Sequence, residues 1–150
     1  MIRIRAVRPS EGARLREIAI ASKAHWGYEL ERVREWAAGG DYTDEALARD
    51  NVYVAEADGR AVAWAALRRK DDDACWLEDL WVEPEWIGKG VGTELFELCR
   101  ERARELGATR LEWEAEPNSV GFYEKRGGRV VDDSRIGSWG RPIPLMELDL

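Results

Sequence analysis

The chain of 150 residues is acidic, with 30 Asp and Glu residues against 23 Lys and Arg residues and a formal net charge of −7. Hydrophobic residues make up 45% and charged residues 35% of the chain, proportions typical of a folded domain and not of a disordered segment. The longest apolar run, residues 61–67, is too short to span a membrane, and no apolar signal core or basic stripe is present. We therefore expect a single cytoplasmic domain over residues 1–150 that binds neither membranes nor nucleic acid.

The first third of the chain predicts one strand and three helices. Residues 2–6 alternate apolar side chains with arginine, which is the period of a half-buried strand. Ser10 is the expected N-cap of a helix that runs through residue 24. A second helix is expected over residues 28–38, ended by two glycines, and a short third helix over residues 43–49.

The rest of the chain predicts strands and helices in irregular alternation. Strands are expected over residues 52–55, 61–68 and 75–82, and Asp58 with Gly59 predicts a hairpin turn between the first two. The remaining elements are a helix over 90–106, a strand over 110–113, a helix over 118–126, and strands over 128–132 and 145–148. This order predicts an α/β protein of the α+β type with a mixed sheet, and not a doubly wound fold.

A glycine-rich turn separates the strand over 75–82 from the long helix. Gly88, Gly90 and Gly92 alternate with other residues, and glycine lets the backbone approach a ligand closely. Because a helix N-terminus follows, we interpret this turn as a site for a phosphate-bearing cofactor. The alternative is a glycine helix entry that only packs on the sheet. A dinucleotide fingerprint is incomplete because its third glycine falls on Thr93, and Lys89 is out of frame for a phosphate loop.

Neither metal chemistry nor covalent catalysis is expected. Cys75, Cys99 and the single histidine, His25, match neither a disulfide framework nor a zinc site. Since neither cysteine has a histidine close to it in the sequence, no activated nucleophile is evident.

The segment from Leu77 to Gly92 resembles the acetyl-CoA-binding core of the GNAT superfamily of N-acetyltransferases. The turn of that family reads Gln/Arg-x-x-Gly-x-Gly/Ala, and Ile87-Gly88-Lys89-Gly90-Val91-Gly92 matches it at both glycines but not at the leading position. The segment 118–127, with Asn118 and Tyr123 five positions apart, is similar to the second motif of the family. The resemblance implies a GNAT fold, with a mixed sheet of about six to seven strands flanked by about four helices and splayed between the fourth and fifth strands.

The resemblance also implies how acetyl-CoA is bound. The strand before the turn would bind the pantetheine arm, the turn would bind the pyrophosphate, and Ile87, which lacks side-chain donors, leaves that task to the backbone. The implied cofactor-binding residues are Leu80, Trp81, Val82, Ile87, Gly88, Lys89, Gly90, Val91, Gly92, Thr93, Asn118 and Tyr123. Taken alone, Asn118 is a good helix N-cap and Tyr123 a core aromatic.

Two residues are expected to be catalytic. By resemblance, Tyr123 faces the cofactor sulfur, where hydrogen bonding to the departing thiolate is a safer expectation than full proton transfer, because phenols have a pKa of about 10 and thiols of about 8.5. An ammonium acceptor must lose a proton before it attacks, and Glu78, directly or through water, is the expected base. Asp79 is the alternative, since neighbouring strand residues point to opposite faces.

The acceptor pocket is expected at the break between the first two helices and in the late hairpin. His25, Trp26, Tyr28 and Trp139, together with Glu78, are the expected substrate-binding residues, and for the lone histidine a structural role is the alternative. The segment 137–142 is expected to form a mobile lid or a partner contact.

The expected function is therefore transfer of an acetyl group from acetyl-CoA to a primary amine of a small molecule, by direct attack in a ternary complex. Two alternatives stay open: acetylation of a protein N-terminus or lysine, and a non-catalytic acyl-CoA-binding module. By analogy with the family, a homodimer is expected as well.

Overall fold

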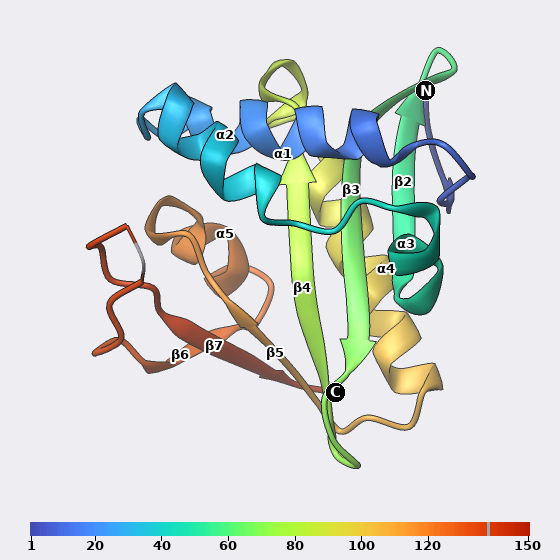
Figure 1. Ribbon diagram of the computed structural model, residues 1–150. Coiled ribbons are helices and arrows are strands. Elements are labelled where there is room, and N and C mark those ends of the chain that lie inside the picture. Colours follow the sequence, from blue (N-terminus) through green and yellow to red (C-terminus); the bar gives the residue numbers. More distant parts are fainter. Residues whose placement is uncertain (138) are drawn as a thin grey trace. The chain divides into compact units, whose positions relative to one another are not determined.

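The computed structural model describes residues 1–137 and 139–150 (Figure 1). Ser138, which belongs to the expected lid, lies outside the described residues. The elements are β1 (Ile2–Ala6), α1 (Gly12–His25), α2 (Leu30–Ala38), α3 (Asp44–Arg49), β2 (Asn51–Ala57), β3 (Arg60–Arg69), β4 (Ala74–Val82), η1 (Pro84–Trp86), α4 (Val91–Glu105), β5 (Arg110–Glu114), η2 (Pro117–Ser119), α5 (Val120–Glu124), β6 (Arg129–Asp132) and β7 (Leu145–Asp149). No helix in this described part of the chain is long and apolar enough to cross a membrane.

The strands form a mixed sheet of seven strands in the order β1-β2-β3-β4-β5-β7-β6. β1 with β2, β2 with β3, β5 with β7 and β6 with β7 are antiparallel pairs. β4 and β5 are parallel and pair only from Ala74 with Arg110 to Trp76 with Glu112. The predicted mixed sheet and its splay between the fourth and fifth strands are confirmed.

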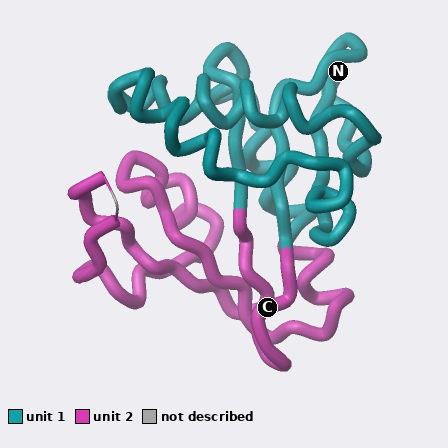
Figure 2. The backbone as a smooth tube through the Cα atoms, viewed as in Figure 1, with its two compact units in different colours: residues 1–67, 79–99 teal, residues 68–78, 100–150 magenta. Residues whose placement is uncertain are grey.

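The chain divides into two compact units (Figure 2). Unit 1 comprises residues 1–67 and 79–99, and unit 2 comprises residues 68–78 and 100–150. Each unit has a buried tryptophan in its core: Trp64 in unit 1 and Trp113 in unit 2.

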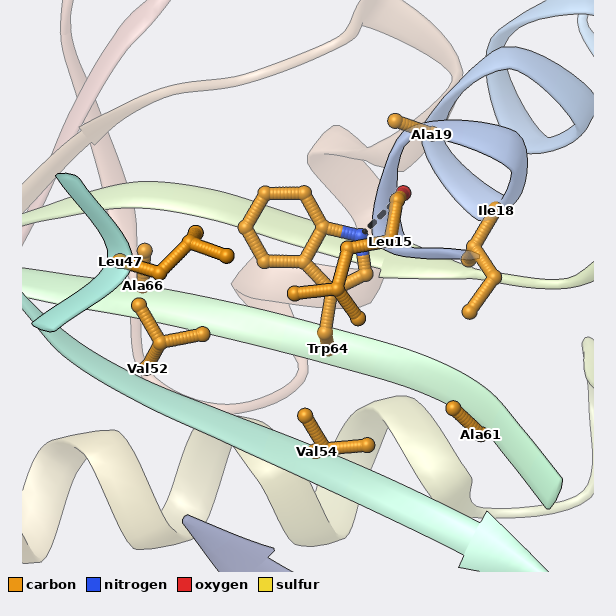
Figure 3. Packing of buried hydrophobic residues seen from close by; sticks show 9 residues of the cluster. All are labelled: Leu15, Ile18, Ala19, Leu47, Val52, Val54, Ala61, Trp64 and Ala66. Carbon is orange, nitrogen blue, oxygen red and sulfur yellow. Dashed lines mark hydrogen bonds between the residues drawn. The ribbon is translucent and has the colours of Figure 1, made fainter. Parts of the chain in front are cut away.

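The core of unit 1 joins α1 to β2 and β3. The indole N–H of Trp64 donates a hydrogen bond of 2.9 Å to the backbone oxygen of Leu15, in the first turn of α1 (Figure 3). Ile18, Val54 and Ala66 pack in the same cluster. Because residues 61–67 of β3 are all buried, both faces of this strand are covered.

Unit 2 combines an apolar core with a ladder of charges. Trp113 on β5 is 1% exposed, and a Cβ added at Gly128 would lie only 2.9 Å from its ring. On the neighbouring position of the strand, the buried Glu112 accepts hydrogen bonds from Lys70 at 2.7 Å and Arg110 at 2.8 Å. The pairing of a buried carboxylate with two cations keeps its charge compensated.

Two predicted helix caps are wrong. Ser10 has a left-handed backbone, with φ of 68°, and its N–H bonds the carboxylate of Asp44, so α1 begins only at Gly12. Asn118 lies inside the 3-10 helix η2 and donates to the carboxylate of Glu116 at 2.8 Å, while α5 begins at Val120. In both places the bond to the carboxylate uses a donor, the backbone N–H of Ser10 and the side-chain amide of Asn118, and not the side-chain oxygen that a cap would use.

Candidate functional site

The glycine-rich turn of unit 1 has an open, left-handed backbone. Gly88 and Gly90 have φ of 81° and 86°, a region that residues with a Cβ rarely adopt. A Cβ added at either position would meet no described atom within 4 Å. Lys89 is exposed, and its Nζ lies 5.1 Å from the ring centroid of Trp86. The turn therefore has room for a ligand to approach its backbone.

The start of α4 supplies donors for an anion. The hydrogen bond from the N–H of Glu94 to the oxygen of Gly90, 3.1 Å long, is the one that opens the helix. The N–H groups of Val91 and Gly92 precede it and point towards the N-terminal end of the helix. With the positive end of the helix dipole, these groups fit the pyrophosphate of the predicted cofactor. Ile87 is extended and half-buried, as expected of a residue that contributes only backbone.

Leu80, Trp81 and Val82 are the last three residues of β4, and all are half-buried. The described ladder between β4 and β5 ends earlier, at Trp76. The backbone of the predicted pantetheine-binding residues therefore lies beyond that ladder.

His25, Trp26 and Tyr28 lie at the break between α1 and α2. His25 is exposed, and its ring touches the edge of the Trp26 ring, with centroids 4.9 Å apart. Gly27, with φ of 91°, turns the chain, and Glu29 caps α2 by accepting two backbone N–H groups. Tyr28, at the same break, is buried, with 9% of its surface exposed.

A lysine is buried beside this break. Lys23 is 8% exposed, and its Nζ lies 4.5 Å from the ring centroid of Tyr28, 5.0 Å from that of Trp36 and 5.8 Å from that of Trp81. Trp36 and Trp81 meet edge to face at 5.5 Å. These four residues, which we call the Lys23 cage, combine a charge with three aromatic faces that attract it.

Sequence reasoning missed the Lys23 cage, although a signal was present. From Leu15 on, the buried residues of α1 are spaced i, i+3, i+4, i+7 and i+8, and they are Leu15, Ile18, Ala19, Ser22 and Lys23; Gly12 is buried one turn earlier. Lys23 thus occupies a core position of the apolar stripe. A lysine at such a position indicates a specific partner, because burial of an isolated charge is costly.

Asp79 shares the face of β4 that carries Trp81. Its carboxylate accepts a hydrogen bond of 2.9 Å from the indole of Trp81. Burial and, to a smaller extent, the charge of Asp79 raise the pKa of Tyr42 to about 12, although Arg16, whose guanidinium lies 4.9 Å from the ring centroid, opposes the shift. Tyr42 is therefore protonated throughout the physiological pH range.

In unit 2, Tyr123 on α5 is 7% exposed. Its ring packs against that of Trp113, with centroids 4.9 Å apart, and against that of Phe122, at 5.1 Å. Asn118 is exposed and bonds Glu116. The position of Tyr123 is thus fixed by aromatic packing within the unit.

Glu78 and Trp139 are the other predicted site residues in unit 2. Glu78 is exposed and forms an ion pair of 2.9 Å with Arg68, whose guanidinium also lies 5.9 Å from the ring centroid of Trp76. Trp139 is half-buried. Since Glu78 and Asp79 point to opposite faces of β4, only Asp79 shares a face with Trp81.

The predicted site residues therefore fall into two groups. Unit 1 contains the turn over residues 87–93, the end of β4 over 80–82, and the helix break with His25, Trp26 and Tyr28. Unit 2 contains Glu78, Asn118, Tyr123 and Trp139.

Comparison with known proteins shows which family the chain resembles over most of its length. Residues 14–128 match the model of the acetyltransferase (GNAT) family. The peptidyl-lysine N-acetyltransferase YjaB of Salmonella typhimurium is 29% identical, over 99% of this chain and 97% of that protein. Among solved structures, the PaiA N-acetyltransferase of Thermoplasma acidophilum, in complex with coenzyme A, is 23% identical with a TM-score of 0.84, covering 100% of this chain and 99% of that one. A GCN5-related N-acetyltransferase from Rhodopseudomonas palustris is 27% identical with a TM-score of 0.80, covering 99% and 95%.

Proposed function

Because the chain belongs to the acetyltransferase (GNAT) family and is thus an acetyl-CoA-dependent acyltransferase, we propose that its acceptor is a primary amine of a small molecule. The amine attacks directly in a ternary complex. Cys75 and Cys99 are both buried, and neither is a candidate for a covalent acyl-enzyme.

The observation that supports a small-molecule acceptor is the burial of the side chains at and around the helix break. Tyr28 and Lys23 are less than a tenth exposed, and Trp26, Trp36 and Trp81 are half-buried. An extended peptide needs an open track along which several residues can lie. A break lined by one buried and three half-buried aromatic rings suits a compact ligand instead.

The residues of the chain divide the work of the reaction. Acetyl-CoA, when bound, supplies a thioester carbonyl that a neutral amine can attack. The backbone of residues 87–93 would hold its pyrophosphate, the backbone of residues 80–82 would hold the pantetheine arm, and Asn118 would add a side-chain amide. Glu78, directly or through water, would accept the proton of the ammonium, and Tyr123 would donate a hydrogen bond to the departing sulfur.

Acetylation of a protein lysine is the second candidate. It is supported by the name of the Salmonella relative, a peptidyl-lysine acetyltransferase that aligns over nearly its full length. The expected homodimer and the cytoplasmic location stay predictions.

The test is a thiol-release screen with acetyl-CoA against polyamines, amino acids, aminoglycosides and lysine-containing peptides. Release of CoA with at least one small amine, at a rate well above that with peptides, is the expected result. Release with peptides alone would establish the second candidate. Tight CoA binding without release in any arm would indicate a non-catalytic acyl-CoA-binding module.

A further inference from the structure

Unit 1 contains a cavity of about 480 Å³ that the proposed reaction does not use. Its walls come from the connection after β1 (residues 6–9), from α3, and from residues 50–53, where β2 begins. Figure 1 shows α3 beside the start of β2, and the two elements are in contact. A volume in this range is typical of pockets that hold a small molecule.

The cavity is separate from the glycine-rich turn. The chain enters that turn after Glu83, whose N–H donates a hydrogen bond of 2.9 Å to the oxygen of Val62, near the connection between β2 and β3. Asn51, at the cavity, pairs with Leu67 towards the other end of β3. The chain thus enters the turn at one end of the β2–β3 hairpin, and the cavity lies at the other. None of the predicted site residues is among the described residues that line the cavity.

The buried part of the cavity lining is apolar. Leu47 of α3 and Val52 of β2 are 7% and 4% exposed, and Val7 is half-buried. Asp44, Leu47 and Ala48 are spaced i, i+3 and i+4, so they share the face of α3 that lines the cavity. A ligand with a hydrocarbon body would remove this apolar surface from water.

One polar group at the cavity has no partner within the protein. Asp50 is half-buried, yet its carboxylate forms no hydrogen bond or ion pair with any residue in the described ranges 1–137 and 139–150. It directly follows the last residue of α3, and the C-terminal end of a helix favours a cation over an anion. A carboxylate that has lost part of its hydration without gaining a partner favours a cationic ligand.

The other charges at the cavity also leave it with a negative excess. Arg8 is the one cation among the described residues that line it, and its guanidinium is exposed and lies 3.9 Å from the carboxylate of Glu56. Asp44 adds a second carboxylate, one oxygen of which accepts the N–H of Ser10 at 2.8 Å. One arginine thus stands against two aspartates, so the lining complements a cation better than an anion.

We propose that this cavity binds a small amine cation with an apolar body, at a site separate from that of acetyl transfer. The apolar body covers Leu47 and Val52, and the ammonium donates a hydrogen bond to the carboxylate of Asp50. This binding does not depend on which amine the enzyme acetylates.

The experiment uses a cation that cannot be acetylated. N,N-dimethylphenethylamine is charged at neutral pH, and its tertiary nitrogen cannot form an acetamide. NMR titrations of the isotope-labelled full chain compare it with N,N-dimethylphenylacetamide, which is neutral, and with phenylpropionate, which is an anion. We expect saturable shifts of the backbone amides in residues 44–53, and an affinity for the amine roughly tenfold or more above that for either comparison compound, as a charged hydrogen bond would give.

Two pairs of variants assign the binding to this cavity. Asp50→Asn should weaken binding of the amine roughly tenfold. Asp58→Asn, at an exposed position in the β2–β3 turn whose φ of 52° asparagine tolerates, should leave it unchanged. Ala48→Trp should fill the cavity and abolish binding, whereas Ala38→Trp places the same side chain at an exposed position of α2 and should not. Thermal unfolding shows whether each variant is folded.

Equal affinities of the wild type for the amine and the neutral amide would overturn the proposal, and this comparison stands even where a variant does not fold. Absence of saturable shifts with the amine, or shifts confined to residues outside 44–53, would overturn it as well. So would unchanged binding in folded Asp50→Asn. Because these titrations measure no thiol release, each of these results leaves the proposed function intact.

Discussion

The ring of Tyr123 lies with its centroid 4.9 Å from that of Trp113, and the two planes are inclined by 44°. Trp113 is itself fixed, because it is fully buried on β5 and Gly128 leaves room for its six-membered ring. Loss of the phenol hydroxyl therefore changes the chemistry at this position without moving the ring.

Tyr123→Phe is expected to lower kcat by about 10²-fold while CoA affinity changes little, because the hydroxyl acts on the sulfur as it departs. Thiol-release kinetics and a CoA titration measure the two quantities. Tyr53→Phe, on β2 of unit 1, is the control and should keep wild-type turnover. Unchanged turnover in Tyr123→Phe would remove this residue from the mechanism.

Glu78→Gln should reduce kcat by about 10²-fold and flatten the loss of rate at low pH, because glutamine cannot accept a proton. A pH–rate profile makes the measurement. Arg68→Gln, which removes the ion pair of Glu78 and the contact with the ring of Trp76, should keep a low-pH limb because the carboxylate remains. If Glu78→Gln keeps the low-pH limb and Asp79→Asn loses it, the base is Asp79.

Gly90→Ala is expected to weaken CoA binding. Its φ of 86° costs a residue with a Cβ about 1 kcal/mol, and relief of that strain would move the N–H groups of the turn. Gly59→Ala, at φ of 78° in the β2–β3 turn, imposes similar strain elsewhere in unit 1. Thermal unfolding should show similar destabilisation in both variants, and isothermal titration should show weaker CoA binding only in Gly90→Ala. Equal CoA affinities would contradict a role for this turn.

Glu112→Gln should destabilise the fold by about 1–2 kcal/mol at neutral pH, a value reduced from that of a fully buried pair because Lys70 and Arg110 are partly exposed. Burial would raise the pKa of Glu112, but the hydrogen bonds from Lys70 and Arg110 outweigh it and hold the pKa below its ordinary value of 4.5.

A group whose pKa is lowered on folding stabilises the fold above its unfolded-state pKa and loses this effect as the pH falls through the folded-state value. Denaturant unfolding should therefore show that the gap between wild type and Glu112→Gln closes below about pH 4.5. Glu114→Gln, at a half-exposed ion pair on the same strand, serves as the control and should change stability little. A gap that widens in acid would contradict this account.

Alkylation of the folded protein should leave turnover intact. Burial raises the pKa of the Cys99 thiol to about 12, and burial also raises the pKa of Cys75, against the opposing charge of Arg69. At pH 8 neither side chain is a thiolate to a useful extent, so iodoacetamide should modify them only after unfolding in guanidinium, as mass spectrometry can show. Rapid inactivation of the folded protein would point to a cysteine in the mechanism.

Local sequence patterns predicted the helices, strands and turns well where neighbouring residues alone determine the backbone. Asp58 and Gly59 do adopt positive φ between paired strands, and the element order matches the expectation from β1 to β7. Ser10 failed as a cap because its backbone is left-handed, and Asn118 because it lies inside η2. The carboxylate that accepts from the N–H of Ser10, that of Asp44, is 34 positions away in the sequence.

The backbone of the glycine-rich turn was predictable from the sequence, whereas the Lys23 cage was not. Gly88 and Gly90 indicate the backbone of the turn directly, because positive φ favours glycine, whereas Gly92 lies inside α4. The Lys23 cage joins residues of α1, α2 and β4 that no local pattern connects. Only the position of Lys23 in the stripe of α1 indicated that it would be buried.

The hydrogen bond between the Trp64 indole and the Leu15 oxygen has a consequence for how unit 1 opens. It ties the first turn of α1 to the middle of β3, under a layer of buried side chains. Leu15 therefore cannot fray by itself, and its amide proton, which is bonded to the oxygen of Glu11, should exchange with deuterium only when the whole unit opens. The capped but short α3, by contrast, is expected to exchange its amide protons through local opening. Amide exchange in unit 1 should therefore be slow at Leu15, near the start of α1, and fast in α3.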